Sequence, residues 1–432
     1  MIIREQKPYN TLILNMMDKL PNINKWRRMF LLETFILFLS IRGRINFLQF
    51  ARYGKYKEQR YRQQFEKRFD FLTFNKELTL SQGSGRYAIA FDPSYVSKSG
   101  KHTPGVGWYW SGCANRAKWG LEIGGLAAID IDNHTAFHLE AVQTLNRGDQ
   151  NLSDWYAGVI SERKDILKSI SKYLVADAWF SKKSFADQVI SSGLHLVSRL
   201  RDDADMKYLC TNTPTGKRGR PRKYTGKIDI SEIDRDYFTF ISGDDETTIY
   251  AGEVYCKALK RNIMLVHVTY SKTNGKNARK LYFSTDISMD PNDVLLYYHS
   301  RFQIEFLYRD GKQHTGLNDS QARSENKLHF QFNASLTSIN IAKAIHCLSI
   351  PEEERGTFSM SDIKTMNHNI LMLNRFFDVF GIYPHSAKNN KHIRELILYG
   401  TMAAKNINEL LTLNTHYQLQ PVMNMFCLCK QY

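Results

Sequence analysis

Four residues near position 300 have spacings that place them on one side of a helix. They are Tyr298, Arg301, Glu305 and Lys312, in the segment YYHSRFQIEFLYRDGK. Each residue of an α-helix advances by about 100°, so the four side chains fall within an arc roughly 60° wide. The arc is consistent with a solvated face, because Arg301 and Glu305 have the i,i+4 spacing of a surface ion pair. The aromatic and aliphatic residues between them instead favour a charged arc beside a packed surface.

Two aspartates further upstream end predicted buried strands, Asp92 in AIAFDPS and Asp177 in YLVADAW. Each has a simple structural explanation, because Asp before Pro-Ser makes a turn and Asp after a strand caps the next helix. With Glu305, however, they form a set of three carboxylates that can converge on a pair of Mg²⁺ ions, which prefer oxygen ligands. Two such ions activate the attacking oxygen and stabilise the leaving oxygen of an in-line phosphoryl displacement. The three acidic residues therefore predict chemistry on a phosphodiester.

The charge of the chain favours a polyanionic partner. It has 59 Lys and Arg against 43 Asp and Glu, a formal net charge of +16, and nucleic acid is the leading candidate. Further cations expected to contact DNA are Lys98 and Lys101 after Asp92, Arg199 at the end of a later strand, and Arg218, Arg220 and Arg222 in the loop KRGRPRK. That loop suits a narrow minor groove or a phosphate clamp. A solvated turn, a surface cation and a flexible charged loop are the respective alternatives.

The order of elements predicts an α/β fold. Residues 1–82 have helical spacing, and from about Arg86 the pattern changes to three β-strands, then helix, strand, helix and strand, ending near Arg199. This order suits a mixed sheet with helices packed on its faces. Strand-like segments with Gly and Asn turns fill residues 201–285, and the remainder is again helical.

Other features of the sequence exclude several classes of protein. The apolar run from Met29 to Ile41 is interrupted by Glu33 and is shorter than the roughly 20 residues that a bilayer requires, so we expect a buried helix and no membrane partner. The N-terminal residues lack the zones of a secretory signal, which predicts a cytoplasmic protein, associated with the nucleoid of a bacterium if it binds DNA. The six cysteines form no CxxC pair, so neither a disulfide framework nor a zinc site is indicated.

The set Tyr298-x2-Arg301-x3-Glu305-x6-Lys312 resembles the Tyr-Arg-Glu-Lys signature of DDE transposases of the insertion-sequence-four type. The resemblance covers about residues 83–348, with an aspartate on the first strand, another after the fourth, and a β-rich insertion before the last acidic residue. It implies a ribonuclease-H-like core, a metal-binding catalytic triad of Asp92, Asp177 and Glu305, and DNA-phosphate contacts from the Tyr, Arg and Lys of the signature. It also implies two Mg²⁺ ions per site, which Mn²⁺ can replace.

The resemblance leads to one functional reading of the whole chain. We expect a cut-and-paste transposase that binds the inverted-repeat ends of a mobile element and target DNA, acts as a homodimer, and catalyses metal-dependent strand cleavage and strand transfer. The alternatives are a catalytically silent transposase-derived DNA-binding protein and a structure-specific nuclease on the same fold. The expected parts are a helical DNA-binding region (1–82), a catalytic core in two segments (83–200 and 286–348), a β-rich insertion (201–285), and C-terminal helices that are candidate subunit contacts (349–432).

One departure from the family pattern concerns aromatic residues. Some relatives are thought to hold a flipped base with a tryptophan in the β insertion, whereas the last tryptophan of this chain is Trp179, before that insertion. Tyr250, Tyr255 and Tyr270 are the alternatives for stacking a base there, and ordinary sheet packing is the competing explanation for each. The hairpin route of excision therefore stays open.

Overall fold

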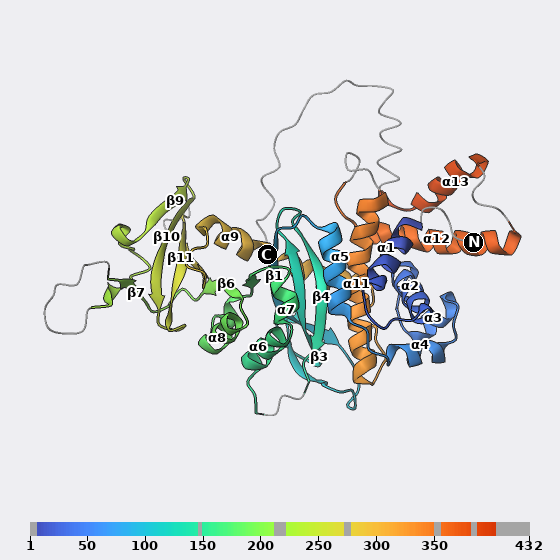
Figure 1. Ribbon diagram of the computed structural model, residues 1–432, viewed down its shortest axis with the longest axis horizontal. Helices are drawn as coiled ribbons and strands as arrows, with labels where there is room; N and C mark the ends of the chain where they lie inside the picture. Colours follow the sequence, from blue (N-terminus) through green and yellow to red (C-terminus); the bar gives the residue numbers. More distant parts are fainter. Residues whose placement is uncertain are drawn as a thin grey trace, which may run out of the picture.

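The computed structural model describes residues 7–145, 149–210, 222–271, 278–349, 356–381 and 387–402. Figure 1 shows an elongated molecule with α-helices at one end, a mixed α/β core in the middle and an all-β part at the other end. The arrangement confirms the predicted α/β class, with a sheet flanked by helices.

Helices fill the described part of the first 82 residues, as predicted. Their bounds are α1 Lys7–Asp18, α2 Lys25–Ser40, α3 Phe47–Tyr53, α4 Glu58–Phe65 and α5 Phe71–Gln82. Asn24 caps α2 by accepting a hydrogen bond from the N–H of Arg27. The apolar run inside α2 is buried against neighbouring helices. In the described part of the chain, no helix has the length and apolar character needed to cross a bilayer.

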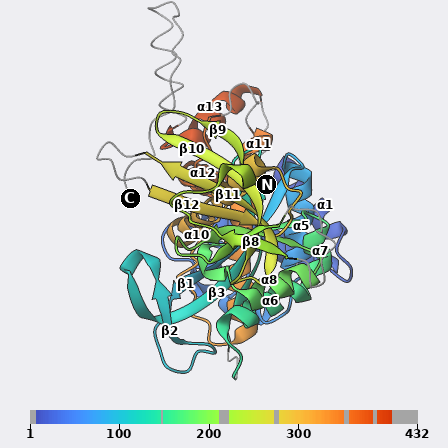
Figure 2. The same ribbon diagram turned by 90° about the vertical axis from the view of Figure 1, so that its left-hand side faces the viewer.

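The core sheet is built around β1, whose first five residues are buried. The core elements are β1 Tyr87–Ser97, β2 Gly107–Ser111, β3 Arg116–Asp130, β4 Thr135–Gln143, α6 Leu152–Glu162, α7 Lys164–Lys168, β5 Tyr173–Val175, α8 Lys183–Ser191 and β6 His195–Leu200. β1 lies between antiparallel β3 and parallel β5, and β5 pairs in parallel with β6. The short strand β2 was not among the predicted strands, and it forms a hairpin with β3 (Figure 2).

The β-rich residues that follow extend this sheet. Their strands are β7 Met206–Leu209, β8 Tyr224–Lys227, β9 Thr239–Gly243, β10 Thr247–Cys256, β11 Arg261–Tyr270 and β12 Ala278–Ser284. β12 pairs with β11 on one side and with β6 of the core on the other. In the described residues, the strands therefore form one 12-stranded sheet that runs from β2 to β8.

The chain then returns to the core through helices. They are α9 Pro291–Ser300, α10 Gln303–His314, α11 Glu325–Ser349, α12 Met360–Phe380 and α13 Ala387–Leu398. The 25-residue α11 packs on the sheet beside α5 and separates the sheet from helices α1 to α4 (Figure 1). On the side of the N-terminal helices, Phe330 contacts Phe65 and Phe71.

Two buried asparagines of α11 close the free edge of β4. Asn340 accepts a hydrogen bond from the N–H of His138 and donates one to its carbonyl, both at 2.8 Å. Asn333 makes the same pair of bonds with Ala141, at 2.7 and 2.9 Å. Each amide side chain thus satisfies the backbone groups that a neighbouring strand would otherwise bind.

Candidate active site

Asp92 lies in the middle of β1, because the strand continues through Pro93 to Ser97 instead of turning. The parallel pairing of Ala90 with Val175 places Asp177, two residues further on, level with Asp92. Side chains two residues apart in a strand share a face, so the two aspartates leave neighbouring strands at the same height. Asp177 also accepts a hydrogen bond from the N–H of Trp179 at 2.8 Å, which caps a 3₁₀ turn over Ala178–Phe180. Asp177 therefore both caps this turn and lies beside Asp92, so the two explanations do not exclude each other.

Tyr308 fixes the helix that carries Glu305 onto the strand that carries Asp92. Its hydroxyl donates a hydrogen bond to the backbone carbonyl of Asp92 at 2.5 Å, and its ring is buried. The ring reaches β1 across Gly125 of β3, where a Cβ atom would lie 2.0 Å from the Tyr308 hydroxyl. Glycine is thus required at position 125 by close approach. Neither Tyr308 nor Gly125 was a predicted site residue. The Gly-Gly pair inside the strand LEIGGLAAIDID was a signal of this close approach.

Arg301 lies between two of the carboxylates. Its Nη1 is 3.5 Å from Oδ1 of Asp92, and its Nη2 is 3.4 Å from Oε1 of Glu305. Burial raises the pKa of Asp92 to about 7, with Arg301 lowering it and the negative charges of Asp177 and Glu305 raising it. Asp92 therefore lies within electrostatic reach of both other acidic residues.

The remaining residues of the signature surround this centre. Burial raises the pKa of the Tyr298 phenol, while Arg301 and Arg199 lower it and Asp177 raises it, so the ring lies among these three groups. Lys312 donates a hydrogen bond to the Ser94 hydroxyl at 3.0 Å, two residues beyond Asp92 on the same face of β1. The structure thus brings the four signature residues and both aspartates to one place.

Two buried donors in this centre have no partner. Nε of Arg199 and Nε of Arg301 make no hydrogen bond with any described part of the chain. Buried donors of this kind normally find an acceptor, so these two are available to a ligand with oxygen atoms.

The prediction of a single helix from Tyr298 to Lys312 is wrong, because the structure has two helices there. α9 ends at Ser300 and α10 begins at Gln303, and the junction is wound tightly. Phe302 N–H bonds His299 O and Ile304 N–H bonds Arg301 O, so each bond spans three residues and not four. Such bonds turn the chain by about 120° per residue, which changes the phase that we calculated for a continuous helix.

The donor set of the site fits hard divalent cations. Three carboxylates face two cations, Arg301 and Lys312; burial is the main cause of the raised pKa of Asp92, and the charges of Asp177 and Glu305 add to it. Mg²⁺ accepts carboxylate oxygens and keeps several waters. With the side chains as they stand, no group of three His, Cys, Asp or Glu residues in the described segments is arranged to hold a metal ion. The guanidinium of Arg301 separates Asp92 from Glu305 in this arrangement.

The comparison with protein families bears on this centre directly. Residues 162–341 match the family model of the transposase DDE domain. The matched segment is therefore a DDE domain, the catalytic domain of a family of enzymes whose members generally use divalent metals. It includes Asp177 and Glu305, whereas Asp92 precedes it. A search of curated proteins found no match to the chain.

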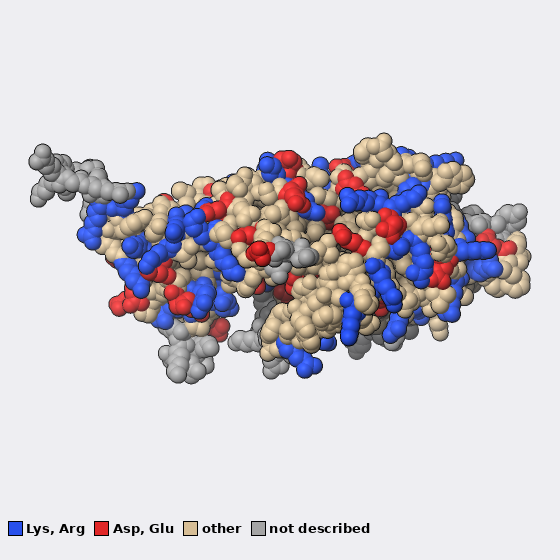
Figure 3. Space-filling view, turned by 90° about the horizontal axis from the view of Figure 1, so that it is seen from below, with Lys and Arg blue, Asp and Glu red and all other residues tan. Residues whose placement is uncertain are grey.

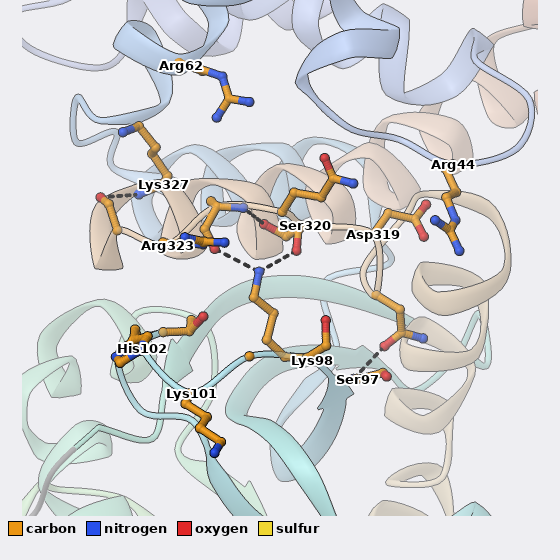
Figure 4. A pocket seen from close by; sticks show the side chains of 17 residues that line it. Arg44, Arg62, Ser97, Lys98, Lys101, His102, Asp319, Ser320, Arg323 and Lys327 are labelled. Carbon is orange, nitrogen blue, oxygen red and sulfur yellow. Dashed lines mark hydrogen bonds between the residues drawn. The ribbon is translucent and has the colours of Figure 1, made fainter.

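A basic groove lies beside the candidate active site. It has a volume of about 1270 Å³ and is lined by the β1–β2 loop, the N-terminal helices and the connection from α10 to α11 (Figure 4). Its cations are Arg44, Arg62, Lys98, Lys101, Arg323 and Lys327, and Asp319 is its one carboxylate within the described residues. Ser97 lines the groove five residues beyond Asp92, which is about 16 Å along an extended strand. That distance corresponds to about five base pairs of DNA.

Lys98 and Lys101, predicted to contact DNA, have different places in the groove. Lys98 donates hydrogen bonds to the carbonyls of Ser320 and Ala322 at 2.6 and 2.8 Å, so it ties the β1–β2 loop to the α10–α11 connection (Figure 4). Burial lowers the pKa of Lys98, and the positive charge of Arg323 lowers it further. Lys101 is exposed at the rim. The cations of the groove therefore repel one another when no DNA is bound, and a DNA backbone in the groove would neutralise them.

Of the three predicted cations in the loop KRGRPRK, the structure describes only Arg222, which lies away from the candidate active site. Arg218 and Arg220 fall in residues 211–221, outside the described residues. Arg222 donates hydrogen bonds to the carbonyls of Tyr224 and Thr225, at β8, the last strand of the sheet. On the face drawn in Figure 3, Lys and Arg side chains extend over both ends of the molecule, with smaller patches of Asp and Glu between them.

The three tyrosines considered for base stacking in the β insertion are engaged within the sheet. Tyr250 contacts the ring of Phe240, Tyr255 contacts Tyr224, and Lys280 lies over the ring of Tyr270. These contacts favour the packing explanation over a base-stacking role.

Proposed function

We propose that the protein is a cut-and-paste DNA transposase of the insertion-sequence-four type, with a ribonuclease-H-like core and Asp92, Asp177 and Glu305 as its catalytic residues. The observation that carries the proposal is the convergence of these three carboxylates, which come from two strand ends and a helix spread over more than 200 residues of the sequence. The DDE match over residues 162–341 supports it.

The three carboxylates would hold two Mg²⁺ ions, or Mn²⁺ in their place. When bound, the ions would supply Lewis-acid activation of the attacking oxygen and charge stabilisation of the leaving oxygen. Arg301 is placed to grip a DNA phosphate with its planar fork of donors, after release from Asp92 and Glu305. Lys312, Tyr298 and Arg199 would contact neighbouring phosphates, and the basic groove would hold the duplex beyond them.

The reaction proceeds by successive in-line displacements at phosphorus. Water attacks the phosphate at the element end, its oxygen bonds to phosphorus, and the bond to the 3′ oxygen breaks, leaving a 3′-hydroxyl and a 5′-phosphate. That hydroxyl then bonds to a phosphorus of either the opposite strand, which forms a hairpin, or the target DNA, and the bond from that phosphorus to the 3′ oxygen of the attacked strand breaks. Catalysis in this scheme is mostly positioning and electrostatic stabilisation.

A homodimer on two DNA ends is part of the proposal. Apolar side chains of α12 and of the segment from α13 to residue 402 are exposed in the described part of the chain: Met372, Phe376, Val379, Phe380, Leu396, Tyr399 and Met402. Exposed large apolar side chains on neighbouring elements support a protein contact. The molar mass of the DNA complex, measured by light scattering, should fall to that of one chain per DNA end when Phe376 and Val379 are both changed to Asp.

The central test uses DNA that carries the reading frame with its own flanks, in Mg²⁺ or Mn²⁺. Asp92→Asn, Asp177→Asn and Glu305→Gln should each abolish strand cleavage while leaving DNA binding in place. Cleavage at near the wild-type rate by any of the three would contradict the assignment of that residue. Binding without cleavage by the wild type would favour the silent DNA-binding protein, and cleavage without joining to a target would favour the nuclease.

A further inference from the structure

The β2–β3 hairpin presents an exposed tryptophan face next to the candidate active site. Trp108 and Trp110 are 70% and 60% exposed, and Trp119 is 38% exposed. Trp108 is paired directly opposite Trp119, and their ring centroids are 5.9 Å apart. Residues two apart in a strand share a face, so the three indoles lie together on one side of the hairpin.

The opposite face of the hairpin holds it against the core. Tyr109 donates hydrogen bonds to the carbonyls of Gly105 and Thr144, and the amine of Lys118 lies 5.8 Å from the ring centroid of Tyr95. Trp119 adds an indole hydrogen bond to the carbonyl of Gly100, in the loop that lines the basic groove. The position of the tryptophan face is therefore fixed by packing on its reverse side.

The tip of the hairpin, Gly112–Ala114, lies near the signature residues. Gly120 of β3 pairs with Ser97 of β1 on one side and with Gly107 of β2 on the other, so the hairpin begins where β1 ends, five residues beyond Asp92. Cys113 at the tip also interacts electrostatically with Lys312, which itself contacts Ser94 of β1. The hairpin stands out from the core sheet in Figure 2.

The charge around the tryptophan face favours one class of occupant. From Pro93 to Leu121 the sequence has four Lys or Arg, namely Lys98, Lys101, Arg116 and Lys118, and no Asp or Glu. Flat aromatic rings between cations are the pattern that binds unpaired bases, because bases stack on the rings while the phosphates meet the cations. A second protein surface would not require a stretch without carboxylates.

We propose that Trp108 and Trp110 stack on unpaired bases of a DNA strand beside the candidate active site. This inference rests on the proposed function and deepens it, since it names the part of the DNA that the hairpin binds. It also assigns base stacking to the core hairpin in place of the β insertion, where the described aromatic rings are engaged with their neighbours.

The test compares the affinity of the full chain for a blunt duplex and for the same duplex with a five-nucleotide dT overhang, at either the 3′ or the 5′ end. The wild type should prefer an overhang duplex. Trp108→Ala and Trp110→Ala should each weaken overhang binding by about 5- to 150-fold per stacked base. Each should change blunt-duplex affinity less than about twofold. Trp108→Phe should keep most of the preference, because a phenyl ring still stacks.

Trp26→Ala is the matched control, because Trp26 is 77% exposed but lies on α2, away from the hairpin. It should bind both DNAs as the wild type does. Unchanged overhang preference in both hairpin variants, or an equal loss on blunt and overhang DNA, would overturn the inference, as would a change in molar mass without a change in DNA affinity. Those results would leave the proposed function standing if the wild type still cleaves DNA. A wild type that binds no DNA would overturn both.

Discussion

Asp92→Asn should stabilise the metal-free protein at neutral pH although it removes a proposed catalytic residue. Burial raises the pKa of Asp92 from 3.8 to about 7. The folded protein therefore binds this proton more tightly than the unfolded chain does. The stability that the proton contributes is fully present below about pH 4, and it is lost as the pH rises to 7.

The size of the effect follows from the two pKa values. A pKa difference of about 3, at about 1.4 kcal/mol for each, gives about 4 kcal/mol at pH 8. Asn has the shape and the charge of the protonated acid, so it avoids this loss at every pH. For a chain of 432 residues that unfolds as one unit, 4 kcal/mol raises the melting temperature by about 4 °C.

The assay is urea or thermal unfolding of wild type and Asp92→Asn in EDTA, at pH 5 and at pH 8. The variant should gain over the wild type mainly at pH 8, and the difference between the two proteins removes the contributions of other titrating groups. Asp286→Asn is a control of opposite sign. Burial alone would raise the pKa of Asp286, but hydrogen bonds from Ser288, Lys172 and Tyr173 hold it well below its usual value. That variant should be destabilised at pH 8.

Two results would refute the reasoning. One is a wild type that is more stable than Asp92→Asn at pH 8 without metal. The other is a stability difference between the two proteins that is the same at pH 5 and at pH 8, because a change of packing, unlike a titration, has no such pH dependence.

Three further predictions concern the groove, the sheet edge and the docking of α10. Arg323→Gln and Lys101→Gln should each weaken duplex binding regardless of sequence and make the slope of log K against log salt shallower by about 0.9, as read from titrations at several salt concentrations. An unchanged slope would remove that residue from the DNA contact. Asn340→Leu should lower the free energy of unfolding by about 2 to 5 kcal/mol, since it leaves two buried backbone groups of His138 unpaired; denaturant unfolding measures this, and a loss below 1 kcal/mol would contradict it. Tyr308→Phe should lower the cleavage rate about tenfold or more with little change in DNA affinity, because misplacement of a catalytic group acts on the chemical step; equal losses in both would point to unfolding instead.

The broad architecture could be predicted because its signals are local. Period-two apolar segments around Asp92 and Asp177 indicated strands, and turn residues marked their ends. A signature with fixed spacings placed Glu305 on a helix. Asp92 and Asp177 lie at one height because each is two residues beyond a member of the parallel pair Ala90 and Val175.

Contacts between distant segments could not be predicted in the same way. The tight turn at Arg301 and Phe302 depends on how α9 and α10 each dock on the sheet, so helical spacing alone gave one continuous helix. The contact of Tyr308 with Asp92 joins residues 216 positions apart. The basic groove combines three separate segments; the β1–β2 loop and the helical region 1–82 were each expected to bind DNA, but their meeting with the α10–α11 connection was not predicted.

The hairpin was missed for a different reason. The segment GWYWS has tryptophans in alternation, which is a strand signal, but it is only five residues long and lies between turn-forming residues. Its pairing with β3 decides its structure, and its exposed face is visible only when the packed face is known.

The position of α11 has a consequence for incomplete chains. The N-terminal helices pack on Phe330, and Asn333 and Asn340 close the edge of β4. The ribosome adds these three residues only after three quarters of the chain has been made. A product that stopped before residue 325 would expose the apolar sides of those helices and an open strand at once. Truncated proteins should therefore be cleared by proteases, and they should not persist as inhibitors that occupy the element ends.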